Sequence, residues 1–381
     1  MKSVKVIVFL MVAMLFFGGC QSNNKEQSSQ EEIKIGALLS LHGANATQGN
    51  LAKNGLLLAV DKVNGAGGIQ GKKIKLIIED TFTEEAKTIS ALKKLATVDK
   101  VQGIVVTGDI ELPIVNKYAD NYKIPIMATI CTGMLDEYRS DWVFRYCYNE
   151  EQEDAFLMKY VSEELGIKDM ALLCPDNVAG KAFYTYSKKY IDMYKINVVA
   201  DISYDPNSTN QRENAFKVIN SNPQIICARG FGSSLDALLK YIGELGYKGP
   251  VVGDLSLSAS TLTQDPNSVL NGAYIVASDM NMESDNPVMA AYAKTYTDMF
   301  KENPCFWDVI GYDSFMYLYY ALKESQEKSV DFKTALFSIR PKDLLLGENW
   351  FEDSNDVSFK KMYIFEMKNG KLSNVRTLSS F

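Results

Sequence analysis

The chain has 381 residues, of which 46% are hydrophobic, 11% aromatic and 23% charged, and these fractions exclude an intrinsically disordered protein. The length favours two domains over a single core. The formal net charge of −7, without a basic block, argues against nucleic acid as a partner. The single histidine, His42, leaves little scope for histidine-based metal sites or catalytic pairs.

The first twenty residues predict an export signal rather than part of the fold. Lys2 and Lys5 precede an apolar run over residues 6–17, which is too short to span a bilayer as a helix. The small residues Gly18 and Gly19 before Cys20 resemble a bacterial lipobox, which implies that Cys20 carries a lipid and becomes the mature N-terminus. An ordinary signal peptide that is cleaved elsewhere stays the alternative. Residues 21–32 are polar and aperiodic and predict a flexible tether.

Five cysteines remain after Cys20, so at least one of them has no disulfide partner within the chain. Cys174 and Cys227 each end a short apolar run, which predicts small buried hydrophobic side chains. The sequence contains no CxxC motif, so neither a redox nor a zinc site is indicated. Cys131 and Cys147 are the one pair for which a bridge is considered, and the sequence leaves that question open.

Short apolar runs that end in turn residues predict a series of strands. Amphipathic patterns between them predict helices, which is typical of parallel sheets covered on both faces. We therefore expect an α/β protein with two doubly wound parallel sheets. The predicted strands cover residues 33–40, 73–80, 101–108, 124–130, 169–176, 196–204, 223–230, 250–256 and 272–280.

Helix boundaries are predicted from capping and stop signals. One helix over residues 50–63 ends at Asn64-Gly65. The Thr81-x-x-Glu84 pattern predicts a capping box for the next helix. Ser233 or Ser234 is predicted to cap a helix that stops at Gly246.

Ligands of open parallel sheets bind outside the carboxyl ends of the strands, close to helix N-termini. The loops at these positions contain hydroxyl groups, glycines and the acidic residues Asp109 and Asp254, but no catalytic pair. They predict a binding site without a cofactor. The loops cover residues 41–48, 107–111, 129–132, 175–180, 230–234 and 254–258.

Several segments resemble the leucine/isoleucine/valine-binding protein family, whose members are solute-binding proteins that serve ABC importers. The similarity extends from Ile33 almost to the C-terminus, with the segments in the same order. The segments that carry it are NGLLLAVDKVNGAGGIQGKKIKLIIEDT (54–81), WVFRYCYNEEQ (142–152), DALLKYIGELGYKGPVVGD (236–254), IGYDSFMYLYYALK (310–323) and KKMYIFEMKNGKL (360–372).

This resemblance implies a type I periplasmic-binding fold. Two doubly wound lobes are joined by three hinge crossings and close around a solute in the cleft between them. The chain order of that fold assigns residues 33–148 and 278–357 to lobe one. Residues 149–277 and 358–381 form lobe two.

The resemblance also implies the binding residues. In the family, lobe one holds the α-carboxylate of an amino acid through amides and a hydroxyl, and an acid of lobe two faces the ammonium, here Asp254. Phe231 stands at an aromatic position of the cleft, although a core role is an alternative for it, as a capping role is for Thr132 and Asp254. The lobe-one positions are Thr107, Gly108, Asp109, Ile130 and Thr132.

Departures from the family pattern affect the expected ligand. Gln48 and Ala179 stand where the family often has aromatic residues, so the site has room for a more polar or larger solute. His42 is predicted on the rim of the cleft.

The sequence therefore predicts a lipid-anchored, extracytoplasmic and monomeric binding protein. It captures an amino acid or related solute, delivers it to an ABC permease and is not an enzyme. A lipoprotein that uses the same cleft to sense a ligand and reports to a receptor is the alternative. A dinucleotide-dependent enzyme is a second alternative, because Gly230-Phe231-Gly232 and the later Asp254 mimic a dinucleotide fingerprint.

Overall fold

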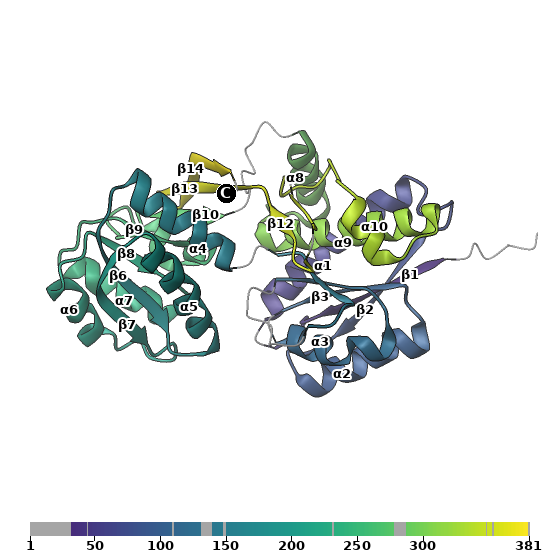
Figure 1. Ribbon diagram of the computed structural model, residues 1–381, viewed down its shortest axis with the longest axis horizontal. Coiled ribbons are helices and arrows are strands. Elements are labelled where there is room, and N and C mark those ends of the chain that lie inside the picture. The colour runs from purple at the N-terminus through teal and green to yellow at the C-terminus, as the bar shows by residue number, and fades with distance from the viewer. Residues whose placement is uncertain are drawn as a thin grey trace, which may run out of the picture. The chain divides into compact units, whose positions relative to one another are not determined.

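The computed structural model describes residues 32–43, 45–108, 110–130, 139–147, 150–230, 232–277, 287–347, 349–352 and 354–379 (Figure 1). Several residues singled out above lie outside these ranges. They are Cys20, Asp109, Cys131, Thr132 and Phe231.

Sheet one contains five strands, all parallel, in the order β2-β1-β3-β4-β5. The continuously apolar strands predicted for this region are present because both faces of the sheet are buried. A fifth strand, β5, was not predicted. The strands are β1 (Ile33–Leu39), β2 (Ile74–Asp80), β3 (Gly103–Thr107), β4 (Ile126–Thr129) and β5 (Val143–Arg145).

Two layers of helices cover sheet one. Right-handed crossovers in this strand order place α1 on one face and α2 and α3 on the other. Helix α9 packs along α1, and α10 packs on α9. The helices are α1 (Ala46–Gly65), α2 (Glu85–Lys94), α3 (Glu111–Tyr122), α8 (Pro287–Phe300), α9 (Phe306–Lys328) and α10 (Phe332–Ser338), with the π-helical turn η1 (Leu95–Asp99) after α2.

Strand β1 shows how the sheet separates these layers. Ile35, Ala37 and Leu39 belong to the core beneath α1 and α9, whereas Leu38 points into the second core with residues of α2 and α3. A two-stranded ribbon of β11 (Asn349–Trp350) and β12 (Ser358–Phe359) lies outside sheet one.

Sheet two contains seven strands in the order β14-β13-β10-β9-β8-β6-β7. The five strands from β6 to β10 are parallel, and the C-terminal hairpin of β13 and β14 is added antiparallel to β10. The strands are β6 (Asp169–Pro175), β7 (Asn197–Tyr204), β8 (Ile225–Ala228), β9 (Val251–Asp254), β10 (Tyr274–Ala277), β13 (Lys361–Lys368) and β14 (Lys371–Ser379).

Helices cover sheet two in the same doubly wound manner. The strand order places α4 and α5, which pack on each other, on one face and α6 and α7 on the other. The helices are α4 (Glu150–Lys159), α5 (Val178–Met193), α6 (Arg212–Asn220) and α7 (Ser233–Glu244), with the short turns η2 (Tyr160–Glu164), η3 (Leu255–Ala259) and η4 (Thr261–Gln264).

The fold class predicted from the sequence is confirmed, but two predicted helix caps are wrong. Helix α2 begins at Glu85, and no capping box forms, because the Thr81 hydroxyl donates to Glu111 instead. Helix α7 is capped by the backbone of Gly232, and the Ser234 hydroxyl donates to the carbonyl oxygens of Asp205 and Ser208. Both hydroxyls bind partners distant in sequence, which a local pattern does not reveal.

Each sheet has a switch point where the strand order reverses, and ligands of doubly wound sheets bind there. In sheet one it lies between β1 and β3, and in sheet two between β6 and β8. We call the carboxyl-terminal ends of the strands of sheet one edge one, and those of sheet two edge two. These two edges position the candidate site.

Two of the chain segments that run between the sheets are bound to each other. Arg145, at the end of β5, forms an isolated parallel bridge with Asp356. Asp356 also accepts bidentate hydrogen bonds from the guanidinium groups of Arg139 and Arg145, at 2.7–2.9 Å. Burial acts to raise the pKa of Asp356, but the two arginines outweigh it and lower that pKa to about 2.

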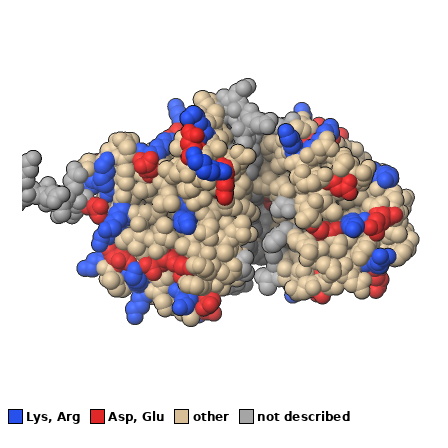
Figure 2. Space-filling view, turned by 180° about the vertical axis from the view of Figure 1, so that it is seen from behind, with Lys and Arg blue, Asp and Glu red and all other residues tan. Residues whose placement is uncertain are grey.

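Charges of both signs are interspersed over the face of the described chain shown in Figure 2. This mixture is typical of the surface of a folded protein. Within the described ranges, no helix has the length and apolarity needed to cross a membrane.

Candidate functional site

Edge one brings together the predicted residues that the structure describes in sheet one. His42 and Gln48 follow β1, Thr107 and Gly108 end β3, and Ile130 follows β4. Thr107 is buried, whereas Gln48 and Ile130 are half-buried. These residues therefore lie at the ends of adjacent strands of sheet one, and their contact with a solute stays a prediction.

The backbone at this edge adopts unusual conformations. Gly108 has a φ of +110°, and its amide donates to the Thr129 carbonyl oxygen at 3.2 Å. Ile130 has a φ of +54°, which is uncommon for a branched side chain and typical of functional sites. One main-chain hydrogen bond thus joins the residue that follows β3 to the last residue of β4.

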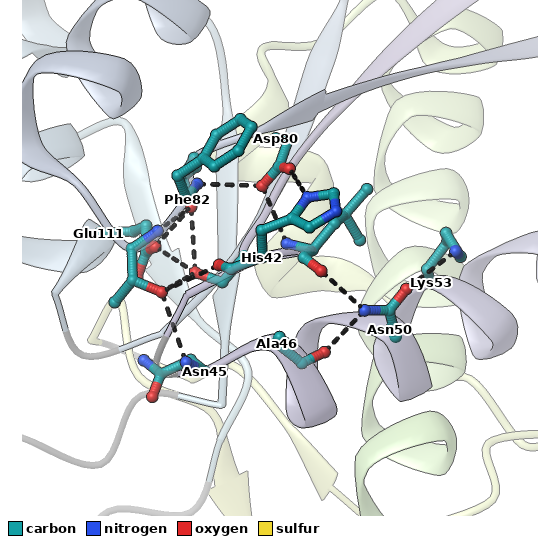
Figure 3. A network of polar contacts seen from close by, with 12 residues as sticks. His42, Asn45, Ala46, Asn50, Lys53, Asp80, Phe82 and Glu111 are labelled. Atoms are coloured by element: carbon teal, nitrogen blue, oxygen red, sulfur yellow. Dashed lines mark hydrogen bonds and ion pairs between the residues drawn. The ribbon is translucent and has the colours of Figure 1, made fainter.

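His42 forms the exposed rim of edge one (Figure 3). Its ring stacks on Phe82 with 5.2 Å between centroids, and its Nδ1 lies 2.5 Å from Asp80 Oδ2. Burial acts to raise the pKa of Asp80, but the hydrogen bonds from His42 and from the amides of Phe82 and Leu41 outweigh it and lower that pKa. The His42 side chain is 71% exposed, and its position on the rim of a cleft stays a prediction.

Beneath this rim lies a buried carboxylate that the sequence analysis did not single out. Glu111, the first residue of α3, is fully buried, and its Oε1 accepts hydrogen bonds from the hydroxyls of Ser40 and Thr81, each at 2.6 Å (Figure 3). The Thr83 hydroxyl in turn donates to Ser40 at 3.2 Å. Edge one therefore contains a negative charge that neutral hydroxyls solvate.

Edge two is organised around Arg229, which follows β8 and is fully buried. Its guanidinium lies 3.4 Å from Asp254, 3.6 Å from Glu153 and 3.7 Å from Asp154, and it covers the Phe183 ring at 4.7 Å. Asp154 and Asp254 both face this one guanidinium, so these two carboxylates together carry more negative charge than it balances. This excess favours a ligand with a positive group.

The charges of this cluster affect one another. Burial raises the pKa of Asp154 to about 6, although Arg229 and the Ser187 hydroxyl oppose the increase. Asp254 adds to the increase through its like charge. Asp154 therefore binds its proton at a higher pH than an exposed aspartate does.

Asp254, the acid predicted to face an ammonium group, ends β9 and is 7% exposed. Its Oδ1 accepts a hydrogen bond from the Ser256 amide at 2.7 Å, so it caps η3. Its Oδ2 faces Arg229 and has no hydrogen-bond donor among the described residues. The capping alternative is thus present in the structure, and contact with a ligand stays a prediction.

Sequence reasoning missed the two residues on which these clusters depend. Arg229 ends an apolar run. A charged residue at such a position requires buried partners, so its place in the sequence was a signal for a buried cluster. Glu111 gave a weaker signal, because an acid in the first turn of a helix is usually exposed. The bridge between Cys131 and Cys147 stays untested, while Cys174 and Cys227 are buried as predicted.

Two doubly wound parallel sheets in one chain, each with a buried polar cluster at its strand ends, are an arrangement suited to ligand binding at those ends. The chain belongs to the periplasmic binding protein family, whose model matches residues 32–371. The family consists of solute-binding proteins of transporters that act outside the cytoplasm.

Individual relatives agree with this assignment. The chain is 23% identical to a Leu/Ile/Val-binding protein homolog of Brucella melitensis, over 90% of this chain and 93% of that protein. Among solved structures it is similar to the branched-chain amino acid transporter substrate binding protein LivJ from Streptococcus pneumoniae in complex with isoleucine. The TM-score is 0.75 at 22% identity, and the match covers 92% of this chain and all of that one.

A second solved structure shows that related folds hold different ligands. A solute binding protein of an ABC transporter from R. palustris, in complex with benzoate, matches with a TM-score of 0.76 and 19% identity. The match covers 92% of this chain and 97% of that one. At these identities the similarity establishes the type I periplasmic-binding fold and does not identify the solute.

Proposed function

We propose that the protein is a lipid-anchored binding protein that captures an amino acid or a related amine-bearing solute and delivers it to an ABC importer. The solute binds between two lobes, formed by residues 33–148 with 278–357 and by residues 149–277 with 358–381. The protein performs no chemistry on the solute and acts as a monomer. Asp109, Thr132 and Phe231 belong to the proposed site on the strength of the family resemblance.

The observation that carries this proposal is the cluster around Arg229. Its three carboxylates are buried at the switch point of sheet two, where one guanidinium faces all of them. A buried charge requires a partner, because transfer from water is costly unless an opposite charge or hydrogen bonds compensate. An ammonium group on the solute would balance the charge that one guanidinium leaves on Asp154 and Asp254. The names of the relatives, which refer to leucine, isoleucine and valine, support the same class of solute.

Capture requires a conformational change that the solute stabilises. The lobes rotate about the crossings and enclose the solute, and this closure is favoured only by contacts made in the closed state. Exclusion of water then strengthens the charge-assisted hydrogen bonds to the head group. A permease can distinguish the loaded protein from the empty one by the relative position of the two lobe surfaces.

The proposal is tested by replacing Asp254 with asparagine, which keeps the size of the side chain and removes its charge. Binding of an amine-bearing solute, measured by calorimetry against amino acids, amides and benzoate, should weaken by about 1.5–3 kcal/mol. Asp265→Asn, at an exposed turn in the same region of the chain, is the matched control and should leave binding unchanged. Equal affinities of the wild type and Asp254→Asn would remove Asp254 from the site.

Thr132→Val should have a smaller effect on the same binding, about 0.5–1.5 kcal/mol, because only a neutral hydroxyl is lost. Native mass spectrometry of the purified protein supplies the identity of any retained solute. A panel in which only solutes without an amine bind would contradict the proposed class of ligand.

The anchor is tested separately. Cys20→Ala should release a folded protein from the membrane, because stable attachment needs more than one acyl chain and this variant loses the site of acylation. Fractionation after a high-salt wash measures the result. A Cys20→Ala protein that stays in the membrane fraction would exclude lipid attachment at this residue.

A further inference from the structure

Glu111 occupies an unusual position for a carboxylate in a binding protein. It lies at the switch point of sheet one, where the ends of β1 and β3 meet, and its side chain is fully buried. A Cβ atom at Gly108 would lie 2.2 Å from Glu111 Oε2, so the carboxylate fills the space beside that glycine. Because Gly108 has no side chain, the carboxylate lies directly against the backbone at the end of β3.

The hydrogen bonds of Glu111 are unequally distributed between its two oxygens. Oε1 accepts from the hydroxyls of Ser40 and Thr81. Oε2 is buried and has no hydrogen-bond donor among the described residues. An ionised carboxylate only accepts hydrogen bonds, and an oxygen left unpaired in the interior is energetically costly. Oε2 is therefore complementary to a donor that the solute brings.

The N-terminus of α3 leads to the same conclusion. Helix N-termini attract carboxylates and phosphates because their amides and dipole are positive. In α3 the protein supplies its own carboxylate at the first helical residue. A carboxylate on the solute would find the positive end of the α3 dipole already compensated by Glu111. The negative charge of Glu111 would also repel it.

From these observations we infer that Glu111 determines specificity, by accepting a hydrogen-bond donor from the solute and rejecting a carboxylate at edge one. The solute class is then an amine with a second donor group, such as an amino amide, an amino alcohol or a diamine. This inference rests on the proposed function and narrows it. Edge two receives the ammonium, and edge one receives a hydroxyl, an amide N–H or a second ammonium.

The test compares L-leucinamide with L-leucine, which differ only in the replacement of the carboxylate by a carboxamide. In calorimetry, the wild type should bind leucinamide at least about tenfold more tightly than leucine, the ratio expected for one hydrogen bond to a charged group. Glu111→Gln should reduce this preference by at least about tenfold, because the amide removes the negative charge and adds a donor.

Two further variants distinguish an effect on ligand specificity from an effect on the folded structure. Glu85→Gln makes the same substitution at the first residue of α2, where the side chain is exposed, and should leave the ratio unchanged. Ser40→Ala removes one hydrogen bond to Oε1 but keeps the charge, so it should retain the preference for leucinamide even if the protein is less stable. If Glu111→Gln does not fold, the inference is tested by the ratio of the wild-type affinities for leucinamide and leucine alone.

A wild-type preference for leucine, or a ratio that Glu111→Gln leaves unchanged, would overturn the inference and leave the proposed function intact. If neither compound binds, native mass spectrometry of the purified protein identifies any retained solute and so tests the inference. A retained amine with a second donor and no carboxylate supports the inference, and a retained solute with a free carboxylate overturns it. The absence of binding and of any retained solute would contradict the proposed function itself, and the inference with it.

Discussion

At edge one a single buried carboxylate, Glu111, is solvated by the hydroxyls of Ser40 and Thr81, whereas at edge two three carboxylates surround the guanidinium of Arg229. The two edges occupy equivalent positions in their sheets, since both lie at a switch point. The topology thus determines where polar groups gather, and the side chains determine how their charge is balanced. Neutral hydroxyls stabilise each charge locally, while an ionic cluster makes every member depend on the others.

The largest difference between the edges should appear when Arg229 is replaced by methionine. This change leaves three buried carboxylates without their cation, so the free energy of unfolding should fall by about 3–5 kcal/mol. Urea denaturation measures the loss. Arg376→Met is the matched control, because Arg376 pairs with Glu164 at an exposed site and should cost at most about 1 kcal/mol. Similar losses in the two variants would show that edge two is not an ionic cluster.

The pH dependence of stability should also distinguish edge two. The pKa of Asp154 is raised to about 6 in the folded protein from 3.8, so between these values the folded state binds more protons than the unfolded chain. The free energy of unfolding therefore falls as the pH rises from about 4 to 6, by up to about 3 kcal/mol for this group.

Asp154→Asn should remove that part of the decline, which denaturation at a series of pH values measures. The comparison between variants is needed because burial also raises the pKa of Asp308 to about 6 and that of Asp313 to about 7. Those two groups contribute equally to the wild type and the variant. Parallel pH profiles of the two proteins would contradict the prediction.

The smallest effects are expected at edge one. Ser40→Ala and Thr81→Val each remove one of two hydroxyls from Glu111 Oε1, so each should reduce the free energy of unfolding by about 0.5–1.5 kcal/mol. The double variant leaves Glu111 without a hydroxyl donor and should cost more than the two single changes together. If the loss of free energy of unfolding in the double variant equals the sum of the losses in the two single variants, the two hydroxyls do not share the carboxylate.

The fold could be predicted from the sequence because the central strands of both sheets, such as β3 and β8, are buried on both faces. Nine runs such as residues 33–40 and 169–176 correspond to strands of the two sheets. Strand β5 was missed because it has three residues and ends in Arg145, which interrupts the apolar pattern. The caps at Thr81 and Ser234 were wrong because those hydroxyls bind residues from other loops.

The candidate site could be predicted from the sequence only in part. The ends of parallel strands indicate where to look, and the structure places Thr107, Gly108, Ile130, Gln48 and His42 at the strand ends of sheet one, while their contact with a solute stays a prediction. Whether a charged residue is buried depends on partners that are distant in sequence. Glu111 receives its hydrogen bonds from residues 30 and 71 positions away, so its environment was not visible in the local pattern.

The bridge between Arg145 and Asp356 has a mechanical consequence. Asp356 binds the guanidinium of Arg145, and the Arg145 amide and carbonyl bind the Asn355 carbonyl and the Val357 amide at 2.7 and 3.0 Å. Two chain segments are thus joined side by side by a single parallel bridge. Because this bridge combines two main-chain hydrogen bonds with an ion pair, the two segments should move as one unit rather than separately.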